Sequence, residues 1–107
     1  VHCAVLEPKE LELRYQKCSP RNTKAGKEEA IYIKSKGLTP VNHSDWALME
    51  SMVDAIRSHP KASEYFADSL GVAEQSHWWD DPESGLCCKC RTDWKVGNTI
   101  IDLKTYC

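Results

Sequence analysis

The chain has 107 residues and a formal net charge of -2, from 14 Lys and Arg against 16 Asp and Glu. This length allows one domain with a modest core, and a composition of 41% hydrophobic and 28% charged residues excludes disordered, collagen-like and membrane-embedded proteins. The apolar runs are shorter than the roughly 20 residues of a bilayer span, and the first residues lack the basic and apolar regions of a signal peptide, so we expect no membrane partner.

The first part of the chain predicts short helices separated by a polar loop. Residues 1–6 place apolar side chains on one helical side before Pro8, which is typical of the last turns of a helix. Residues 18–37 are rich in Pro, Gly, Ser and basic side chains. They predict a loop with a short helix over 27–34.

Two better-marked helices follow. The first begins at Asn42 or Ser44, either of which can cap it, and ends at Ser58. Its apolar stripe has the three- and four-residue spacing of a helix and consists of Trp46, Met49, Val53 and Ile56. The second starts with Pro60 in its first turn and is expected to end at Gly71 as a C-terminal cap. Its apolar side consists of Ala62, Tyr65, Phe66 and Leu70.

In the last third of the chain the hydrophobic period changes from helical to alternating. This change predicts strands over 72–79, 86–94 and 99–105. Turn-forming residues at 80–85 and 96–98 join them. The predicted fold class is therefore α+β, or a mixed α/β sheet, with helices followed by a three-stranded antiparallel meander.

The charges are unevenly distributed along the chain. Residues 1–40 carry eight Lys and Arg and five Asp and Glu, residues 41–85 carry two and nine, and residues 86–107 carry four and two. Such blocks are usually solvated helix faces, which is the interpretation that charge alone favours. A basic N-terminal segment is also what a phosphate backbone attracts, so this alternative stays open.

Half of the six cysteines lie close together, at Cys87, Cys88 and Cys90. Small disulfide-stabilised domains spread their cysteines between loops, so the clustering predicts reduced thiols and a cytoplasmic protein. Zinc sites usually place two residues between paired cysteines. We therefore expect these three to pack as small hydrophobic side chains along a strand.

Charged residues gather in the predicted meander. Asp102 and Lys104 are two residues apart on the third strand, so both point to one face. A hairpin brings Asp93 opposite Asp102, and Glu74 on the first strand adds a third carboxylate. Convergent carboxylates repel one another unless a cation neutralises them, and hard oxygen ligands select Mg²⁺ or Mn²⁺. A lysine beside such a site can activate a metal-bound water for phosphodiester cleavage.

An Asp-x-Lys pair alone is more often a solvent-facing ion pair than a catalytic one. Here the pair follows the apolar residues 99–101, and Asp93 precedes it by one hairpin. This context favours the catalytic interpretation.

Several ordered motifs resemble a known nuclease family. Glu74, Asp93 and the segment 101–105 (IDLKT) resemble the PD-(D/E)xK signature in its RecB-like form, which has an upstream histidine in a helix. More closely, four segments are similar to the C-terminal nuclease domains of the RecE type, the exodeoxyribonuclease VIII family of lambdoid prophages. These segments are 2–8 (HCAVLEP), 22–28 (NTKAGKE), 79–91 (WDDPESGLCCKCR) and 102–105 (DLKT).

The resemblance implies a restriction-endonuclease-like core with a metal-dependent centre. Asp93 and Asp102 would hold Mg²⁺, or Mn²⁺, with the main-chain carbonyl of Leu103 as a further ligand. Lys104 would position and activate the attacking water.

Two further residues gain a role through the family. His2 corresponds to its upstream histidine, a contributor to the metal site, and Glu74 matches a carboxylate that supports the metals or their waters. The reaction would be hydrolysis of double-stranded DNA from a 5′ end, which leaves 3′ single strands for a single-strand annealing protein in recombination. Because the family forms tetrameric rings that thread DNA, the basic loop offers candidate DNA-binding residues. These are Arg21, Lys24 and Lys27.

We therefore expect residues 1–107 to form a single, truncated nuclease domain of a bacterial or phage-encoded cytoplasmic enzyme. Members of the family continue past the Asp-x-Lys strand into a helix with a Gln-x-x-x-Tyr motif, and they begin before the histidine. The alternative is a non-catalytic prophage remnant that acts as a structural module or binds DNA or protein.

Overall fold

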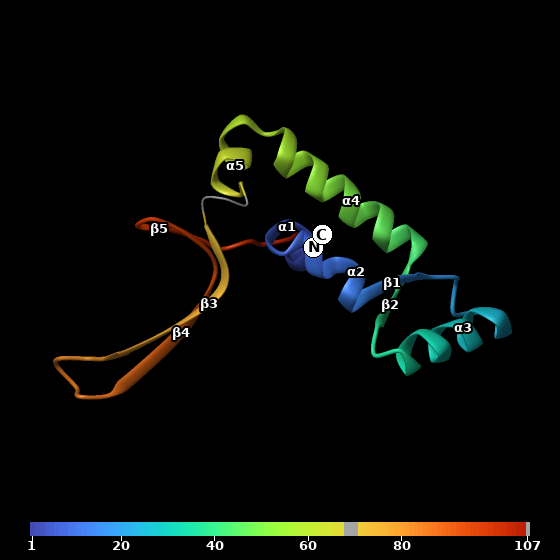
Figure 1. Cartoon of the computed structure of the whole chain (residues 1–107), viewed down its shortest axis with the longest axis horizontal. Helices are drawn as coiled ribbons and strands as arrows, with labels where there is room; N and C mark the ends of the chain where they lie inside the picture. Colours follow the sequence, from blue (N-terminus) through green and yellow to red (C-terminus); the bar gives the residue numbers. More distant parts are fainter. Residues whose placement is uncertain (68–70, 107) are drawn as a thin grey trace.

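The computed structural model describes residues 1–67 and 71–106, in an elongated arrangement measuring 58 × 36 × 26 Å (Figure 1). The radius of gyration is 17.8 Å, whereas a compact chain of this length has about 13 Å. The excess arises because a long β-hairpin projects from one end of the helices, while a smaller unit around α3 lies at the other. The predicted α+β class is confirmed, since helices precede a three-stranded antiparallel sheet.

The elements in chain order are α1 (His2–Leu6), η1 (Pro8–Glu10), α2 (Leu11–Arg14), β1 (Tyr15–Cys18), α3 (Lys24–Ser35), β2 (Thr39–Asn42), α4 (His43–Ser58), α5 (Pro60–Tyr65), β3 (Val72–Asp80), β4 (Cys87–Val96) and β5 (Thr99–Ile101).

The unit at one end consists of β1, α3 and β2. The two strands pair in parallel, from Tyr15 opposite Thr39 to Cys18 opposite Asn42, and α3 connects them. The loop predicted over 18–37 lies between these strands and contains α3, and no strand was predicted on either side of it. Each strand has only four residues and shows no clear alternation, so the local pattern does not reveal a pairing that forms across an intervening helix.

Helix α3 is also longer than the predicted 27–34. It begins at Lys24 because the Thr23 hydroxyl caps it and accepts the Gly26 amide at 3.1 Å. A side chain at Gly26 would collide with the Pro20 carbonyl, so glycine permits the close approach of the preceding turn. Helix α3 buries Ile33 against Cys18, which forms the small core of this unit.

Helix α4 matches its prediction closely and buries Val53, with Met49 and Ile56 packed beside it. Helix α5 is shorter than predicted, because it ends at Tyr65 with Phe66 as its C-cap. The prediction of Gly71 as the cap was therefore wrong, and Leu70 lies outside the described residues.

The antiparallel meander has the predicted order β3-β4-β5. Strands β3 and β4 pair from Val72 opposite Lys95 to Asp80 opposite Cys87. Strand β5 ends at Ile101, so the predicted extension of the third strand to Thr105 was wrong, and Asp102 and Lys104 follow the strand instead of belonging to it.

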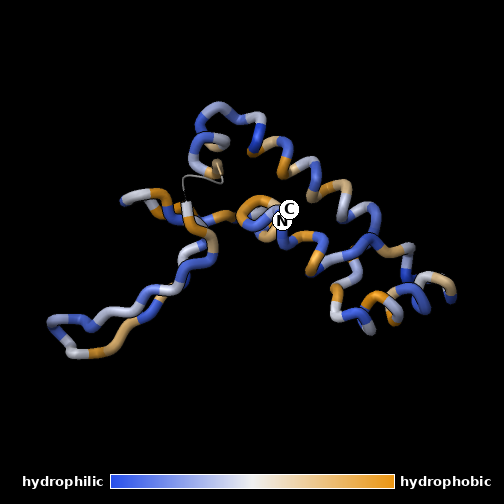
Figure 2. Tube along the Cα trace, in the orientation of Figure 1, coloured by the Kyte–Doolittle hydropathy of each residue, from blue (hydrophilic) through white to orange (hydrophobic). Residues whose placement is uncertain are grey.

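The main core joins the base of the meander to the helices. Its buried residues are Ala4, Val5, Leu6, Val53 and Trp94. The Trp94 indole N–H donates to the Tyr65 carbonyl at 2.5 Å, and its ring lies 5.9 Å from that of Phe66. Figure 2 shows the hydrophobic residues of α1 at the centre of the molecule. The sheet is therefore anchored at one end.

The outer half of the β3–β4 hairpin extends beyond this core (Figure 1). Cys87 and Cys90 are exposed and Cys88 is half-buried, and all three are free thiols. The prediction that they pack as buried hydrophobic side chains was wrong, because the helices reach only the base of the sheet.

Candidate functional site

The register of β4 and β5 brings two of the predicted carboxylates together. Trp94 is the first residue of β4 that pairs with β5, and it lies opposite Ile101. Asp93 precedes Trp94 and Asp102 follows Ile101, so the hairpin through Gly97 places these two carboxylates level with each other. Strand pairing thus positions these side chains although Asp102 lies just outside β5.

Lys104 lies beside Asp102. Its ammonium nitrogen Nζ is 2.8 Å from Asp102 Oδ2, and both side chains are largely exposed. The hydrogen bond from Lys104 lowers the pKa of Asp102, to which Asp93 and His2 also contribute, and the reciprocal hydrogen bond raises the pKa of Lys104. At neutral pH both groups are charged, and the Lys104 ammonium can donate further hydrogen bonds.

Asp93 is held from two further directions. Its side chain is 20% exposed, and Oδ2 lies 3.4 Å from His2 Nε2 at the start of α1. The same oxygen accepts the main-chain N–H of Leu103 at 2.8 Å. Helix α1 and the segment after β5 therefore both meet β4 at this carboxylate, and it is the amide of Leu103, not its carbonyl, that contacts it.

Glu74 has a different partner. Since Ala73 pairs with Trp94 and Gln75 with Thr92, Glu74 falls level with Asp93 on the neighbouring strand. It has a φ of 51°, a left-handed conformation, and its Oε2 accepts from Arg91 Nε at 2.8 Å. Sequence reasoning did not identify Arg91, although its diagonal position across the strand pair is the signal for such a contact.

The predicted DNA-binding residues lie elsewhere. Arg21, Lys24 and Lys27 are exposed in the turn before α3 and in its first turns, and the Arg21 guanidinium contacts Asn42 Oδ1 at 3.4 Å. In Figure 1 α3 and the projecting hairpin lie at opposite ends of the long axis. The structure thus gathers four of the predicted residues (His2, Asp93, Asp102 and Lys104) and leaves the basic loop apart from them.

The two carboxylates of this cluster suit a hard divalent cation such as Mg²⁺ or Mn²⁺, whereas the imidazole of His2 is a ligand more typical of zinc, copper, iron or nickel. In residues 1–67 and 71–106, no group of three or more His, Cys, Asp or Glu side chains is arranged to hold a metal ion. In the arrangement described, the Lys104 ammonium is the positive charge next to Asp102.

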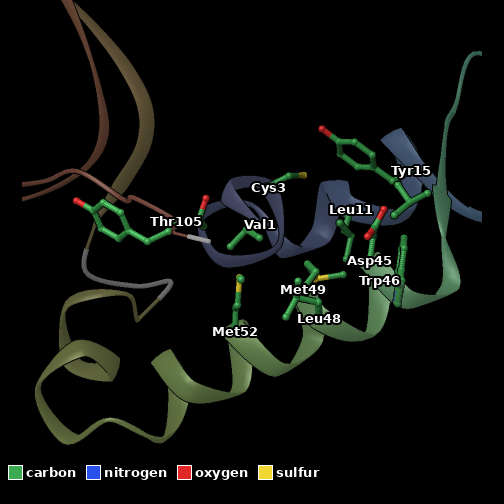
Figure 3. A pocket seen from close by; sticks show the side chains of 12 residues that line it. Val1, Cys3, Leu11, Tyr15, Asp45, Trp46, Leu48, Met49, Met52 and Thr105 are labelled. Atoms are coloured by element: carbon green, nitrogen blue, oxygen red, sulfur yellow. The ribbon is translucent and has the colours of Figure 1, made fainter.

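A mostly apolar pocket of about 360 Å³ lies between α4 and the first helices (Figure 3). Leu11, Trp46 and Met49 contribute to its wall, and Thr105, directly after Lys104, borders it. Asp45 brings a carboxylate to its edge. The residues that line it do not include His2, Asp93, Asp102 or Lys104.

Comparison of the chain with protein-family models, with curated proteins and with solved structures finds no match. The resemblance to RecE-type nucleases therefore depends on the motifs themselves. Of the helices in the part of the chain that the structure describes, none is both long enough and apolar enough to cross a membrane.

Proposed function

We propose that this chain is a Mg²⁺-dependent exonuclease domain of the RecE type, which hydrolyses double-stranded DNA from a 5′ end and leaves 3′ single strands. The observation that carries the proposal is the meeting of His2, Asp93, Asp102 and Lys104 from three separate segments of the chain. The cluster joins α1, β4 and the segment after β5.

In this proposal Asp93 and Asp102 hold the metal, supported by His2, by Glu74 and by the main-chain carbonyl of Leu103. Bound Mg²⁺, or Mn²⁺ in its place, supplies the Lewis acidity that activates a water and polarises a phosphate.

The chain's own contribution beside the carboxylates is the Lys104 ammonium. In the arrangement described, its hydrogen bond to Asp102 raises the pKa of this ammonium. In the proposal it is the hydrogen-bond donor that positions and activates the attacking water.

The test is digestion of linear duplex DNA that carries a 5′ label, in the presence of Mg²⁺. We expect release of labelled mononucleotides, and a rate at least about 100-fold lower in Asp102→Asn and in Lys104→Met. Asp54→Asn removes an exposed carboxylate from α4 and is the matched control, with an unchanged rate. Failure of the unaltered chain to release nucleotides, or equal rates in all three variants, would falsify the proposal.

A second candidate function is a non-catalytic module that binds DNA or protein. The observation that favours it is the internal pairing of the cluster, since Lys104 neutralises Asp102 and the Leu103 amide and His2 contact Asp93. Titration with Mn²⁺, followed by NMR line broadening at Asp93 and Asp102, distinguishes the two. A saturable effect that disappears in Asp102→Asn supports the enzyme, and no effect supports the module.

The enzyme proposal includes its partners. These are duplex DNA ends, a single-strand annealing protein that receives the 3′ strand, and three further copies of the chain in a ring, in the cytoplasm of a bacterium. The free thiols of the described cysteines support a reducing compartment. Light scattering with and without duplex DNA measures the mass, and a monomer under both conditions contradicts the ring.

A further inference from the structure

The outer hairpin has two chemically different faces. Side chains alternate along each strand, and directly opposed residues of an antiparallel pair share a face. The contact of Arg91 with Glu74 identifies one face, and the contact of His77 with Thr92 at 3.3 Å identifies the other. The His77 face continues into the buried Trp94 at the base of the sheet, whereas the Arg91 face continues to Asp93 in the candidate site.

The Arg91 face carries an exposed aromatic ring beside two cations. Trp78 is 68% exposed and pairs directly with Lys89. Arg91 follows two residues further along the same strand and remains 62% exposed while it contacts Glu74. Asp93 comes after another two residues. At about 3.4 Å per residue, Lys89 lies about 14 Å from Asp93 along β4.

We propose that this face of the hairpin, formed by Trp78, Lys89 and Arg91, binds single-stranded nucleic acid and leads the strand to Asp93 and Asp102. Trp78 stacks on an unpaired base, Lys89 contacts a phosphate beside the ring, and Arg91 contacts a phosphate on the side toward the carboxylates. The binding site stands on the geometry of the hairpin. Its role in delivering a strand depends on the function proposed above.

The chemistry of the face favours a single strand over a duplex. An indole ring that projects from a two-stranded ribbon can stack only on a base that has left its own stack, and such stacking tolerates any base. Lys89 and Arg91 supply the sequence-independent attraction to the backbone. Asp80, opposite Cys87 on the same face, repels phosphates and so limits the basic run on the side of the turn.

The hairpin provides its own control. Trp79 is next to Trp78 in sequence and is 49% exposed, but it pairs with Cys88 on the opposite face. Replacing either ring removes a similar exposed surface from the same ribbon. Only Trp78 shares a face with Lys89, Arg91 and the candidate site.

The experiment measures binding of a fluorescein-labelled oligothymidylate to the whole chain by anisotropy, in EDTA so that no strand is cleaved. We expect Trp78→Ala to weaken binding by about 5-fold to 100-fold, and Trp78→Phe to retain most of it. Lys89→Ala reduces the slope of log affinity against log salt by about 0.7, the value for one phosphate contact on a single strand. Trp79→Ala leaves both quantities unchanged, as does Lys61→Ala, which removes a cation from α5.

Several results would overturn the inference. Equal losses in Trp78→Ala and Trp79→Ala would mean that the hairpin binds without a preferred face. Tighter binding of a blunt duplex that is insensitive to Trp78, or no binding of the oligonucleotide at all, would also exclude the site. If the face instead binds a protein partner, the chain does not bind the oligothymidylate.

The two proposals fail in different ways. If the chain binds oligothymidylate through Trp78 but releases no nucleotides with Mg²⁺, the hairpin site stands and the nuclease falls. If it releases nucleotides while Trp78→Ala binds normally, the nuclease stands and the hairpin site falls.

Discussion

The base and the outer half of the β3–β4 hairpin are parts of one antiparallel ribbon, yet they stand in different surroundings. At the base Trp94 is 3% exposed and is enclosed by α1, α4 and the end of α5. In the outer half, Trp78 and Trp79 lie on the surface. Strands β3 and β4 are paired antiparallel on both sides of Glu74, so the burial of one face at the base is the main difference between the two parts. Where one face is buried, the ribbon positions the carboxylates Asp93 and Asp102, and in the outer half its tryptophan side chains are exposed.

The sharpest test of this difference compares tryptophans at the two ends. Trp94→Ala removes the central side chain of the main core and leaves the Tyr65 carbonyl without its donor. We expect a loss of about 3–5 kcal/mol in the free energy of unfolding. Trp78→Ala should change it by no more than about 0.5 kcal/mol. Urea unfolding measures both, and similar losses would mean that the outer half also packs against the body.

The base can also be disturbed by adding an atom. A side-chain carbon at Gly71 would lie 2.5 Å from Cε2 of Trp94, whose ring is buried and cannot move freely. Gly71→Ala should therefore cost about 1–3 kcal/mol of the free energy of unfolding. The double variant Gly71→Ala with Trp94→Leu should lose less of the free energy of unfolding than the sum of the losses in the two single variants, because the smaller side chain relieves the collision. Additive losses would place the ring elsewhere.

The junction between the two parts lies at Glu74. In an ordinary strand, glycine lowers the free energy of unfolding by about 0.5–1 kcal/mol relative to alanine. At Glu74 the backbone has a φ of 51°, which favours glycine, so Glu74→Gly should be at least as stable as Glu74→Ala. Both variants lose the contact with Arg91, so this loss cancels in the comparison. A more stable alanine variant would show that β3 runs through the junction without the left-handed residue.

The smallest expected effect concerns the ion pair after β5. The pKa of Asp102 lies below its ordinary value of 3.8, chiefly through the hydrogen bond from Lys104. The pair therefore contributes stability above that value, and the contribution is lost as the pH falls through the lowered pKa. Lys104→Met should raise the pKa of Asp102, measured by carbon NMR of the carboxyl group. Asp81 is the control, because hydrogen bonds from Ser84 lower its pKa and do not involve Lys104.

The periodicity of apolar residues and the turn-forming residues predicted the parts of the fold that depend on neighbours in sequence. Helix α4 carries an apolar stripe, and the meander carries alternation with turn residues between its strands, so both were found. The pairing of β1 with β2 was missed, since a parallel pair forms through a crossover that short strands do not reveal. Helix α3 began earlier than expected because the Thr23 cap, not the apolar spacing, determines its first residue.

The candidate site shows the same division. Proximity of Asp93 and Asp102 follows from hairpin register, which the sequence specifies through the turn at Gly97. Choice of partner does not follow from register. Glu74 contacts Arg91, and the Leu103 amide contacts Asp93, because side-chain conformations decide these contacts. The exposure of the cysteines in the outer hairpin could not be predicted either. Alternation shows which residues share a face of the sheet, but not whether another element covers that face.

The contact between His2 and Asp93 joins the beginning of the chain to its last hairpin. Closing so long a loop is among the least local steps in the folding of this protein, and contacts of high sequence separation tend to form late. The meander can bring Asp93 and Asp102 together early, through local pairing alone. The imidazole reaches Asp93 only when α1 is docked on the sheet, so any opening of α1 separates the histidine from the carboxylates.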